Sequence, residues 1–313
     1  MNPEVIVLGG CVTDFTVYTP RLPVPGETVV AKLFQYGYGG KAANSAYMCV
    51  LLGVHTILIS KLGDDYFGQN YLKHLEAIGI NVRHVTVEKN CSSPIANITV
   101  ADSGENSIVY FPGCLDRIAE TDIKSAESMF KRAKVFACVF EAPMTVIRLA
   151  LQLARQHRMI TYVNAAPNVS ESLLKDCLPL IDYICVNETE GSTLVCTIKG
   201  EPQGLLSDQE VVDFLLSAGV GTVIITKGKK GAVFSQEPTK LQSVAAEPVT
   251  NVVDTTGAGD AFNGSFIYHL ARNIQLPLED KIRKACGIAS LSVQKKGTQP
   301  SYPKKEELAD KFL

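Results

Sequence analysis

The sequence has few features that would tie it to nucleic acid, to a membrane or to an oxidising compartment. Its 313 residues carry 30 Lys and Arg against 32 Asp and Glu without a basic block, so no nucleic-acid partner is expected. No apolar run is long enough to span a bilayer, and the run over 5–10 is too short for a signal peptide. The nine cysteines are odd in number and form no C-x-x-C pair, which indicates reduced, mostly buried thiols. Together these absences predict a cytoplasmic protein, which could also be present in the nucleus, and no membrane partner.

Two common nucleotide-binding motifs are also missing. The segment GGCVTD (9–14) lacks the third glycine and the spacing of G-x-G-x-x-G, which argues against a nicotinamide dinucleotide. The sequence contains no G-x-x-x-x-G-K-[ST], so it is not a P-loop kinase. It also has no internal repeat, low-complexity tract or linker, and we therefore expect a single domain over 1–313.

The order of the apolar runs predicts an α/β fold, because short continuous apolar runs alternate with helix-spaced segments. Strands are expected at 5–10, 56–63, 135–140, 159–164, 182–187 and 222–228. Helices are expected at 41–53, 67–79, 144–157, 170–178, 188–197 and 208–219. This alternation predicts a doubly wound, mostly parallel sheet covered on both faces. Two regions break the order with exposed, alternating patterns, and they predict a small antiparallel β lid built from about 16–38 and 94–112.

The most informative stretch is DTTGAGDAF, residues 254–262. Gly257, Ala258 and Gly259 are expected to form the first turn of a helix, where small residues and free N–H groups favour an anion. Asp260 follows in the same turn, and its carboxylate would repel a bound phosphate unless it takes a proton from an attacking group. That pairing is the chemistry of phosphoryl transfer to an alcohol. On these residues alone, an ordinary capped helix explains the pattern equally well.

Other polar residues follow the strand ends, where ligands bind in doubly wound folds. Carboxylates at Asp14 and Glu141 suit vicinal sugar hydroxyls, although both could cap loops. In GYGGKAANSA (37–46), Lys41 and Asn44 can face one side of a helix start, although a flexible loop and an exposed lysine also fit. Asn187 and Glu190 could orient a hydrated Mg²⁺, or simply cap a helix. The turn 226–231 could lie at the phosphates of a nucleotide or be a solvated hairpin turn.

Two longer signatures carry a resemblance to a known family. The first is GGKAANSA (39–46), with Gly53 and Gly63 at the expected distances, and the second runs from Asp254 through Gly264. Over essentially its whole length the chain resembles the ribokinase, or PfkB, family of sugar kinases. Within that family it is most similar to the ribokinase group, through PGET (25–28), FEAP (140–143), NETE (187–190) and GTQPSYP (297–303). Departures from the usual pattern are Val12, Ala42, the lid segment PGCL (112–115), Ser265 and Cys286.

The resemblance implies an ATP-dependent kinase that phosphorylates D-ribose at O5, with Asp260 as the base and Gly257, Ala258 and Gly259 as the anion hole. The implied ribose contacts are Asp14, Gly40, Lys41, Asn44, Glu141 and Asp260. The implied nucleotide contacts are Asn187, Thr226, Gly228, Gly231, Gly259 and Cys286, with Asn187 and Glu190 in the outer shell of Mg²⁺. An activating K⁺ is implied at Asp254, Thr256, Ser292, Lys295, Gly297 and Ser301. The family's lid often pairs with the lid of a second subunit, which implies a homodimer. A kinase for another sugar or a nucleoside, and a catalytically silent sugar-binding member, are the alternatives.

Overall fold

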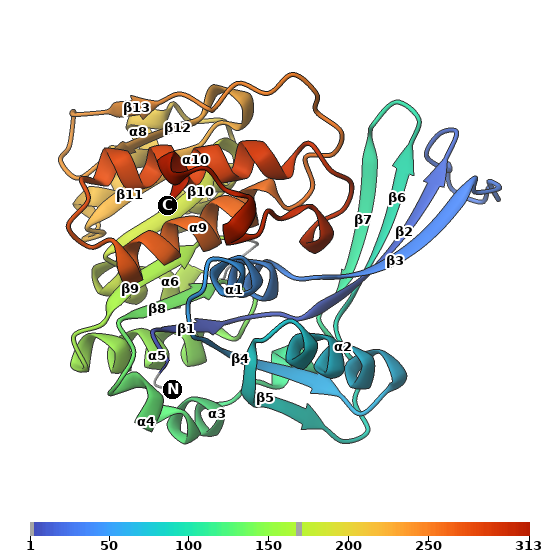
Figure 1. Cartoon of the computed structure of the whole chain (residues 1–313), viewed down its shortest axis with the longest axis horizontal. Helices are drawn as coiled ribbons and strands as arrows, with labels where there is room; N and C mark the ends of the chain where they lie inside the picture. The colour runs from blue at the N-terminus through green and yellow to red at the C-terminus, as the bar shows by residue number, and fades with distance from the viewer. Residues whose placement is uncertain (1–2, 167–170) are drawn as a thin grey trace.

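In the part of the chain that the structure describes, nine strands form the main sheet, in the order β13-β12-β11-β10-β9-β8-β1-β4-β5 (Figure 1). The computed structural model describes residues 3–166 and 171–313. The strands are β1 Val5–Leu8, β4 Thr56–Gly63, β5 Asn81–Glu88, β8 Val135–Val139, β9 Ile160–Asn164, β10 Tyr183–Asn187, β11 Thr222–Thr226, β12 Ala232–Ser235 and β13 Gln242–Val244. Neighbouring strands are parallel except at β11–β12 and β12–β13. The mostly parallel sheet expected from the sequence is therefore confirmed.

Helices cover both faces of this sheet. One face carries α1 Lys41–Leu51, α2 Tyr66–Ala77, α9 Ala258–Arg272 and α10 Leu278–Ser292. The other carries α3 Glu120–Ser125, α4 Glu127–Phe130, α5 Met144–Gln156, α6 Glu171–Cys177, α7 Glu188–Lys199 and α8 Asp208–Ser217. Along β1, Val5 and Val7 join the first core, and Ile6 and Leu8 join the second, as the alternation of side chains on a strand requires. Short 3-10 turns are η1 Gly113–Arg117, η2 Leu178–Leu180, η3 Gly228–Lys230, η4 Gln299–Ser301, η5 Lys305–Glu307 and η6 Asp310–Phe312.

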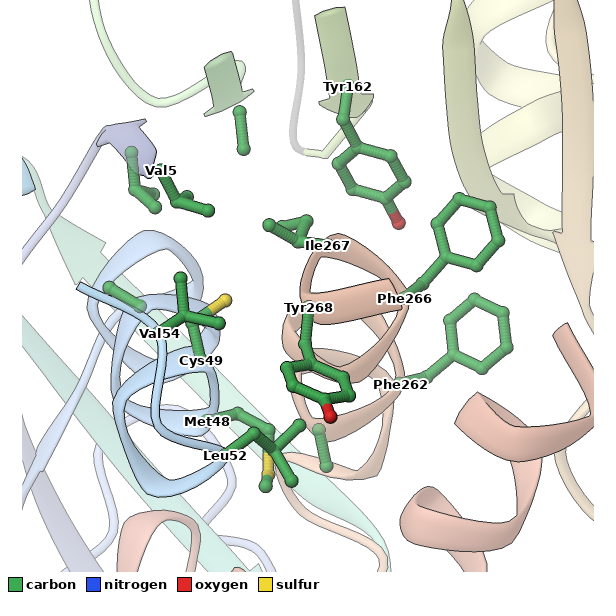
Figure 2. Packing of buried hydrophobic residues seen from close by; sticks show 14 of the residues in the cluster. Val5, Met48, Cys49, Leu52, Val54, Tyr162, Phe262, Phe266, Ile267 and Tyr268 are labelled. Atoms are coloured by element: carbon green, nitrogen blue, oxygen red, sulfur yellow. The ribbon is translucent and has the colours of Figure 1, made fainter. Parts of the chain in front are cut away.

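The close contact of α1 with α9 depends on a glycine. A Cβ atom added at Gly264 would lie 2.5 Å from the Cβ of Met48 and 2.5 Å from the backbone oxygen of Ser45. With glycine at this position the helices lie close enough for the Cys49 thiol to donate a hydrogen bond to the Gly264 carbonyl oxygen at 3.2 Å. Figure 2 shows Met48 and Cys49 of α1 facing Ile267 and its neighbours on α9. Any side chain at 264 would push the helices apart, so the bare backbone there allows the middle of α9 to pack closely against α1.

The lid is a second sheet with the order β3-β2-β6-β7, and it projects from one side of the main sheet (Figure 1). Its strands are β2 Val12–Thr19, β3 Leu33–Gly39, β6 Ile95–Ala101 and β7 Asn106–Phe111. The pairs β2–β3 and β6–β7 are antiparallel, whereas β2 and β6 pair in parallel. The lid expected over 16–38 and 94–112 is thus present, with one parallel pairing at its centre. It begins earlier than predicted, at Val12, so Asp14 belongs to a lid strand.

The helices and strands expected from apolar spacing all occur, with bounds that differ by a few residues at most. For the helix expected over 170–178, residue 170 lies outside the described residues. The sequence analysis did not predict the short helices α3 and α4, and it also missed two longer elements, β5 and α10. Strand β5 lies at the sheet edge with mixed burial, and α10 begins with charged residues, so neither has a strong apolar signature. Over residues 3–166 and 171–313, the structure has no helix with the length and apolar character needed to cross a membrane.

Candidate active site

Gly39, Gly40 and Lys41 form a turn, called the GGK turn below, that connects the lid strand β3 to the start of α1. A Cβ at Gly39 would lie 2.1 Å from a carboxylate oxygen of Asp14, and one at Gly40 would lie 2.5 Å from the Gly10 oxygen. Gly40 also has a φ of 91°, a conformation that favours glycine. Both positions therefore need a bare backbone, and Asp14 is held directly beside the turn that precedes Lys41.

The second signature forms the start of α9. Gly257 is the N-cap, in a left-handed conformation with φ 78°, and the helix begins at Ala258. A Cβ at Gly257 would lie 2.4 Å from the Thr298 side chain, whereas one at Gly259 would meet nothing within 4 Å. The predicted helix start is confirmed: Gly257 caps it, and Ala258 and Gly259 open its first turn. The N–H groups of this turn are at the open end of the helix, where an anion is favoured.

Asp260 is buried in this first turn and is held by Asn44 of α1. Asp260 is 8% exposed, and the Asn44 amide nitrogen donates to its Oδ2 at 2.8 Å. Burial raises the pKa of Asp260, and the charge of Glu190 adds to this effect. The charge of Lys41 and the Asn44 hydrogen bond act in the opposite direction, because both favour the carboxylate. Burial outweighs these two interactions, so the net pKa of Asp260 is raised, and Lys41 and Asn44 are the groups that favour its ionised form.

Two further carboxyl groups face the same space. Burial, together with the charges of Asp260 and Glu141, raises the pKa of Asp14 to about 7. Burial also raises the pKa of Glu141, although its Oε2 accepts from the Gly10 N–H at 2.9 Å. Lys41 partly offsets this negative charge: burial lowers its pKa, but Asp260, Glu190 and Glu141 outweigh that effect and raise it. Over the residues that the structure describes, no group of three or more His, Cys, Asp and Glu side chains is arranged to hold a metal ion.

The NETE segment lies at the carboxyl end of β10 and starts α7. Asn187 accepts from the Glu190 N–H at 2.8 Å, and Glu190 accepts from the Asn187 N–H at 3.0 Å, so the two form a capping box. Asn187 and Glu190 therefore cap α7 in this structure, as one of the two interpretations of this segment predicted. The other oxygen of Glu190 lies 3.5 Å from the Lys41 ammonium. This ion pair joins the NETE segment to the GGK turn, 149 residues away in sequence.

The turn after β11 is closed by its own backbone. Thr226 donates from its hydroxyl to the Val186 oxygen at 3.3 Å, and the Lys227 N–H donates to the Gly231 oxygen at 2.7 Å. Gly228 and Gly231 both have positive φ, and a Cβ at Gly231 would lie 2.0 Å from the Val244 oxygen. This glycine turn lies next to the start of α7, because β10 and β11 are neighbours.

Cys286 lies buried on α10. Burial raises the pKa of its thiol to about 12, so it is neutral at physiological pH. An adenine contact of Cys286 stays a prediction.

Asp254 links the segment before α9 to the loop after α10. Its two carboxylate oxygens accept from the Thr256 N–H at 2.9 Å and from the Gly297 N–H at 3.0 Å. Burial opposes ionisation of Asp254, but these hydrogen bonds outweigh it and lower the pKa. Ser292 and Ser301 are both buried, and the Ser301 hydroxyl donates to the Thr298 oxygen at 2.7 Å. A monovalent cation site at these residues stays a prediction.

Three residues that the sequence analysis did not single out lie against these groups. Gln299 donates from its amide to the Asn44 Oδ1 at 3.0 Å, and its own oxygen lies 2.7 Å from His74 Nε2. The Tyr302 hydroxyl donates to the Gly257 oxygen at 3.0 Å. Gln299 and Tyr302 lie in the GTQPSYP segment, which was a usable signal. No sequence pattern connects position 74 to it.

The comparisons with known proteins agree with this geometry. The family described as pfkB family carbohydrate kinase matches residues 2–305. A Mus musculus ribokinase is 33% identical over 304 residues, covering 97% of this chain and 93% of that protein. A Dictyostelium discoideum ribokinase is 34% identical, covering 98% of this chain and 100% of that protein. The structure of an Arabidopsis thaliana ribokinase complexed with ribose and ATP is 27% identical and superposes with a TM-score of 0.86, covering 98% of this chain and 97% of that one. With the family's match running along nearly the whole sequence, the chain belongs to the pfkB family of carbohydrate kinases.

Proposed function

We propose that this chain transfers the γ-phosphoryl group of ATP to O5 of D-ribose and so forms ribose 5-phosphate. The observation that carries the proposal is the buried Asp260 carboxylate at the start of α9, held by the Asn44 amide at 2.8 Å. A carboxylate beside an anion-binding turn suits a base that acts on a hydroxyl next to a phosphate. The Arabidopsis relative that binds ribose and ATP supports the choice of both substrates.

The sugar is proposed to bind between the lid and the starts of α1 and α9. Asp14 and Glu141 accept hydrogen bonds from ribose hydroxyls, and Lys41 and Asn44 donate to them. The bare backbone at Gly40 lets the sugar approach the turn, since a side chain there would already collide with Gly10. Two carboxylates and two donors in one partly enclosed space match a polyol, which needs many directional partners.

In the proposed reaction, Asp260 accepts the proton as the O5–H bond breaks. The O5 oxygen forms a bond to the γ-phosphorus in line, while the bond between that phosphorus and the β–γ bridging oxygen breaks and ADP leaves. The turn formed by Gly257, Ala258 and Gly259 offers N–H groups to the charge that develops on the phosphoryl oxygens. The open space beside Gly259 supports this role, because nothing lies within 4 Å of an added Cβ there.

The nucleotide is proposed to lie along the ends of β10 and β11. Its contacts are Asn187, Thr226, Gly228, Gly231, Gly259 and Cys286. Bound Mg²⁺ would supply charge neutralisation across the phosphates, with Asn187 and Glu190 in its outer shell through water. Glu190 suits that position, since it already lies 3.5 Å from Lys41 at the border between the sugar and nucleotide regions.

A monovalent cation is proposed beside the anion turn. Asp254, Thr256, the backbone oxygens of Ser292, Lys295 and Gly297, and the Ser301 hydroxyl would hold it, and K⁺ fits their mostly neutral oxygens. Hydrogen bonds of the Asp254 and Ser301 side chains hold the backbone on either side of the proposed cation site. The backbone groups belong to Thr256, Gly297 and Thr298. Such an ion would touch no substrate, so its effect would be on the geometry of the anion turn.

The proposal also includes the assembly and the cell compartment. We take residues 1–313 as one catalytic domain with the lid as a subregion. The lid exposes Phe34, Tyr36, Ile108, Val109 and Phe111, which are between 49% and 68% exposed. Exposed apolar strands with free edges are commonly covered by a partner, and we propose a homodimer through the lids. A cytoplasmic location follows from the scattered cysteines, which are free in this structure.

A coupled ADP-release assay over pentoses, hexoses and nucleosides tests the function. D-ribose should give the highest kcat/KM, and the Asp260→Asn variant should lose roughly two to four orders of magnitude in turnover while keeping ribose affinity. A preference for a hexose or a nucleoside would overturn the choice of substrate. Binding of ribose without any turnover would favour a silent sugar-binding protein.

A further inference from the structure

We propose that Gln299 and His74 are positioning residues that set the direction of the Asn44 amide and thereby hold Asp260 ready as a base. This inference rests on the proposed function. The structure contains an unbroken series of side-chain contacts, from Asp260 to Asn44 at 2.8 Å, from Asn44 to Gln299 at 3.0 Å and from Gln299 to His74 at 2.7 Å. The four residues come from α9, α1, η4 and α2. Asn44 and Gln299 are each only 4% exposed, so water competes little for their amide groups.

In each hydrogen bond of this series, the donor and the acceptor are determined by the bond before it, starting from Asp260. An ionised Asp260 can only accept, so Asn44 must present its NH₂ group to it. Asn44 then offers its oxygen to Gln299, which must present its own NH₂ group. The Gln299 oxygen is left facing His74 Nε2, and that nitrogen must carry a hydrogen. An amide has nearly the same shape in its two orientations, so without Gln299 only Asp260 itself would oppose a turned Asn44 amide.

His74 is well placed to act as the fixed end of this series. Its ring stacks on Tyr38, with ring centres 4.0 Å apart and an angle of 15° between the planes, and it also lies against Tyr71. The Tyr71 hydroxyl is itself anchored to the Gly39 oxygen in the GGK turn. Burial lowers the pKa of His74, so the ring is neutral at physiological pH, and the Gln299 oxygen selects the tautomer with hydrogen on Nε2.

The consequence for the base is electrostatic. Burial favours the neutral form of Asp260, and the donated Asn44 hydrogen bond is one of the two interactions that oppose burial. None of the charged groups around Asp260 lies in η4, so we expect them to stay in place when Gln299 is changed. These groups are Lys41, Glu190, Asp14 and Glu141. The phenols of Tyr162 and Tyr302 also face it, and both are neutral because burial raises their pKa. A turned Asn44 amide would place its oxygen against the carboxylate, so Asp260 would ionise only at higher pH.

The decisive variant is Gln299→Glu, which keeps the shape but can only accept when ionised. It would draw the NH₂ group of Asn44 away from Asp260. We expect kcat for ribose at pH 7 to fall by about 10-fold to 100-fold, and the acid limb of the kcat profile to move up by about one to two pH units. Gln299→Met, which neither donates nor accepts, should give a smaller shift in the same direction. His74→Phe keeps the stack and loses the N–H group, and it should lower kcat by roughly threefold, whereas His74→Gln retains a donor and should stay near wild type.

Gln156→Glu on the exposed end of α5 is the matched control for the added charge and should leave the profile unchanged. Urea unfolding of each variant shows whether it is folded. An acid limb that does not move in folded Gln299→Glu and Gln299→Met would overturn the inference, as would a loss confined to KM. Recovery of the Gln299→Glu profile in excess K⁺ would also overturn it, because the segment would then act through the cation loop. If the wild type transfers nothing to ribose, the proposed function fails instead, and the profile is measured with the accepted sugar.

Discussion

Replacing Asp14 by asparagine is expected to stabilise the ligand-free protein above neutral pH. Asp14 lies on β2, and burial with the nearby charges of Asp260 and Glu141 raises its pKa from 3.8 to about 7. Asparagine has nearly the same shape and cannot ionise. The Asp14→Asn variant therefore removes the cost of holding a third negative charge in this space while leaving the packing against Gly39 in place.

The magnitude follows from the shift in pKa. A change of about three pKa units corresponds to about 4 kcal/mol, at ~1.4 kcal/mol per unit. Asp14 is only partly buried, so solvent screening reduces this to roughly 1–2 kcal/mol. Between about pH 4 and pH 7, the folded protein holds a proton that the unfolded chain has already released. The free energy of unfolding of the wild type therefore falls as pH rises through this window, and this loss is complete above pH 7.

Urea unfolding at pH 5.5, 7 and 8.5 measures this effect. The variant's gain over the wild type should grow by about 1 kcal/mol between pH 5.5 and pH 8.5. Asp64→Asn, at an exposed position between β4 and α2, is the control and should show no such growth. Calorimetry should show ribose affinity weaker by about 1.5–3 kcal/mol with ATP affinity unchanged. A gain that does not vary with pH would refute the electrostatic argument, and an equal loss for both ligands would make Asp14 a structural residue.

Three shorter predictions concern the cation, the lid and a buried hydroxyl. At constant ionic strength and saturating Mg²⁺, K⁺ should raise turnover strongly and Na⁺ weakly. Equal turnover in K⁺, Na⁺ and a bulky organic cation would leave Asp254 as a helix cap only. Light scattering at micromolar concentration should show a dimer that Val109→Glu converts to a monomer, and a monomeric wild type would exclude pairing through the lids. Ser265 is fully buried, and its hydroxyl has no hydrogen-bond partner among the described residues, so Ser265→Ala should raise the free energy of unfolding by up to about 1 kcal/mol. A loss in that urea titration would mean that the hydroxyl is satisfied, for example by a buried water.

Local patterns in the sequence predicted most of the architecture, because apolar spacing depends on neighbouring residues along the chain. The helix start at Gly257 and the glycine pair before Lys41 were predicted for the same reason. The parallel pairing of β2 with β6 was not, since it joins strands whose first residues are 83 positions apart and no local pattern encodes it. The ion pair of Lys41 with Glu190 was likewise out of reach. Each of these two residues was identified, but under separate roles.

The segment from Gly297 to Tyr302 shows why the predicted site residues needed a partner that the sequence did not reveal. Its Gly297 N–H binds Asp254, its Gln299 amide binds Asn44, and its Tyr302 hydroxyl binds the Gly257 oxygen. One short segment thus holds Asp254, which precedes the anion turn, the Asn44 amide, which binds Asp260, and Gly257, which is the N-cap of α9. It contributes no side chain to the reacting atoms in the proposed mechanism. Because it touches the base and the anion turn together, a change within it should disturb their relative geometry, which is used in the transition state, more than the binding of either substrate. For variants in this segment, kcat should therefore fall with little change in the ribose dissociation constant.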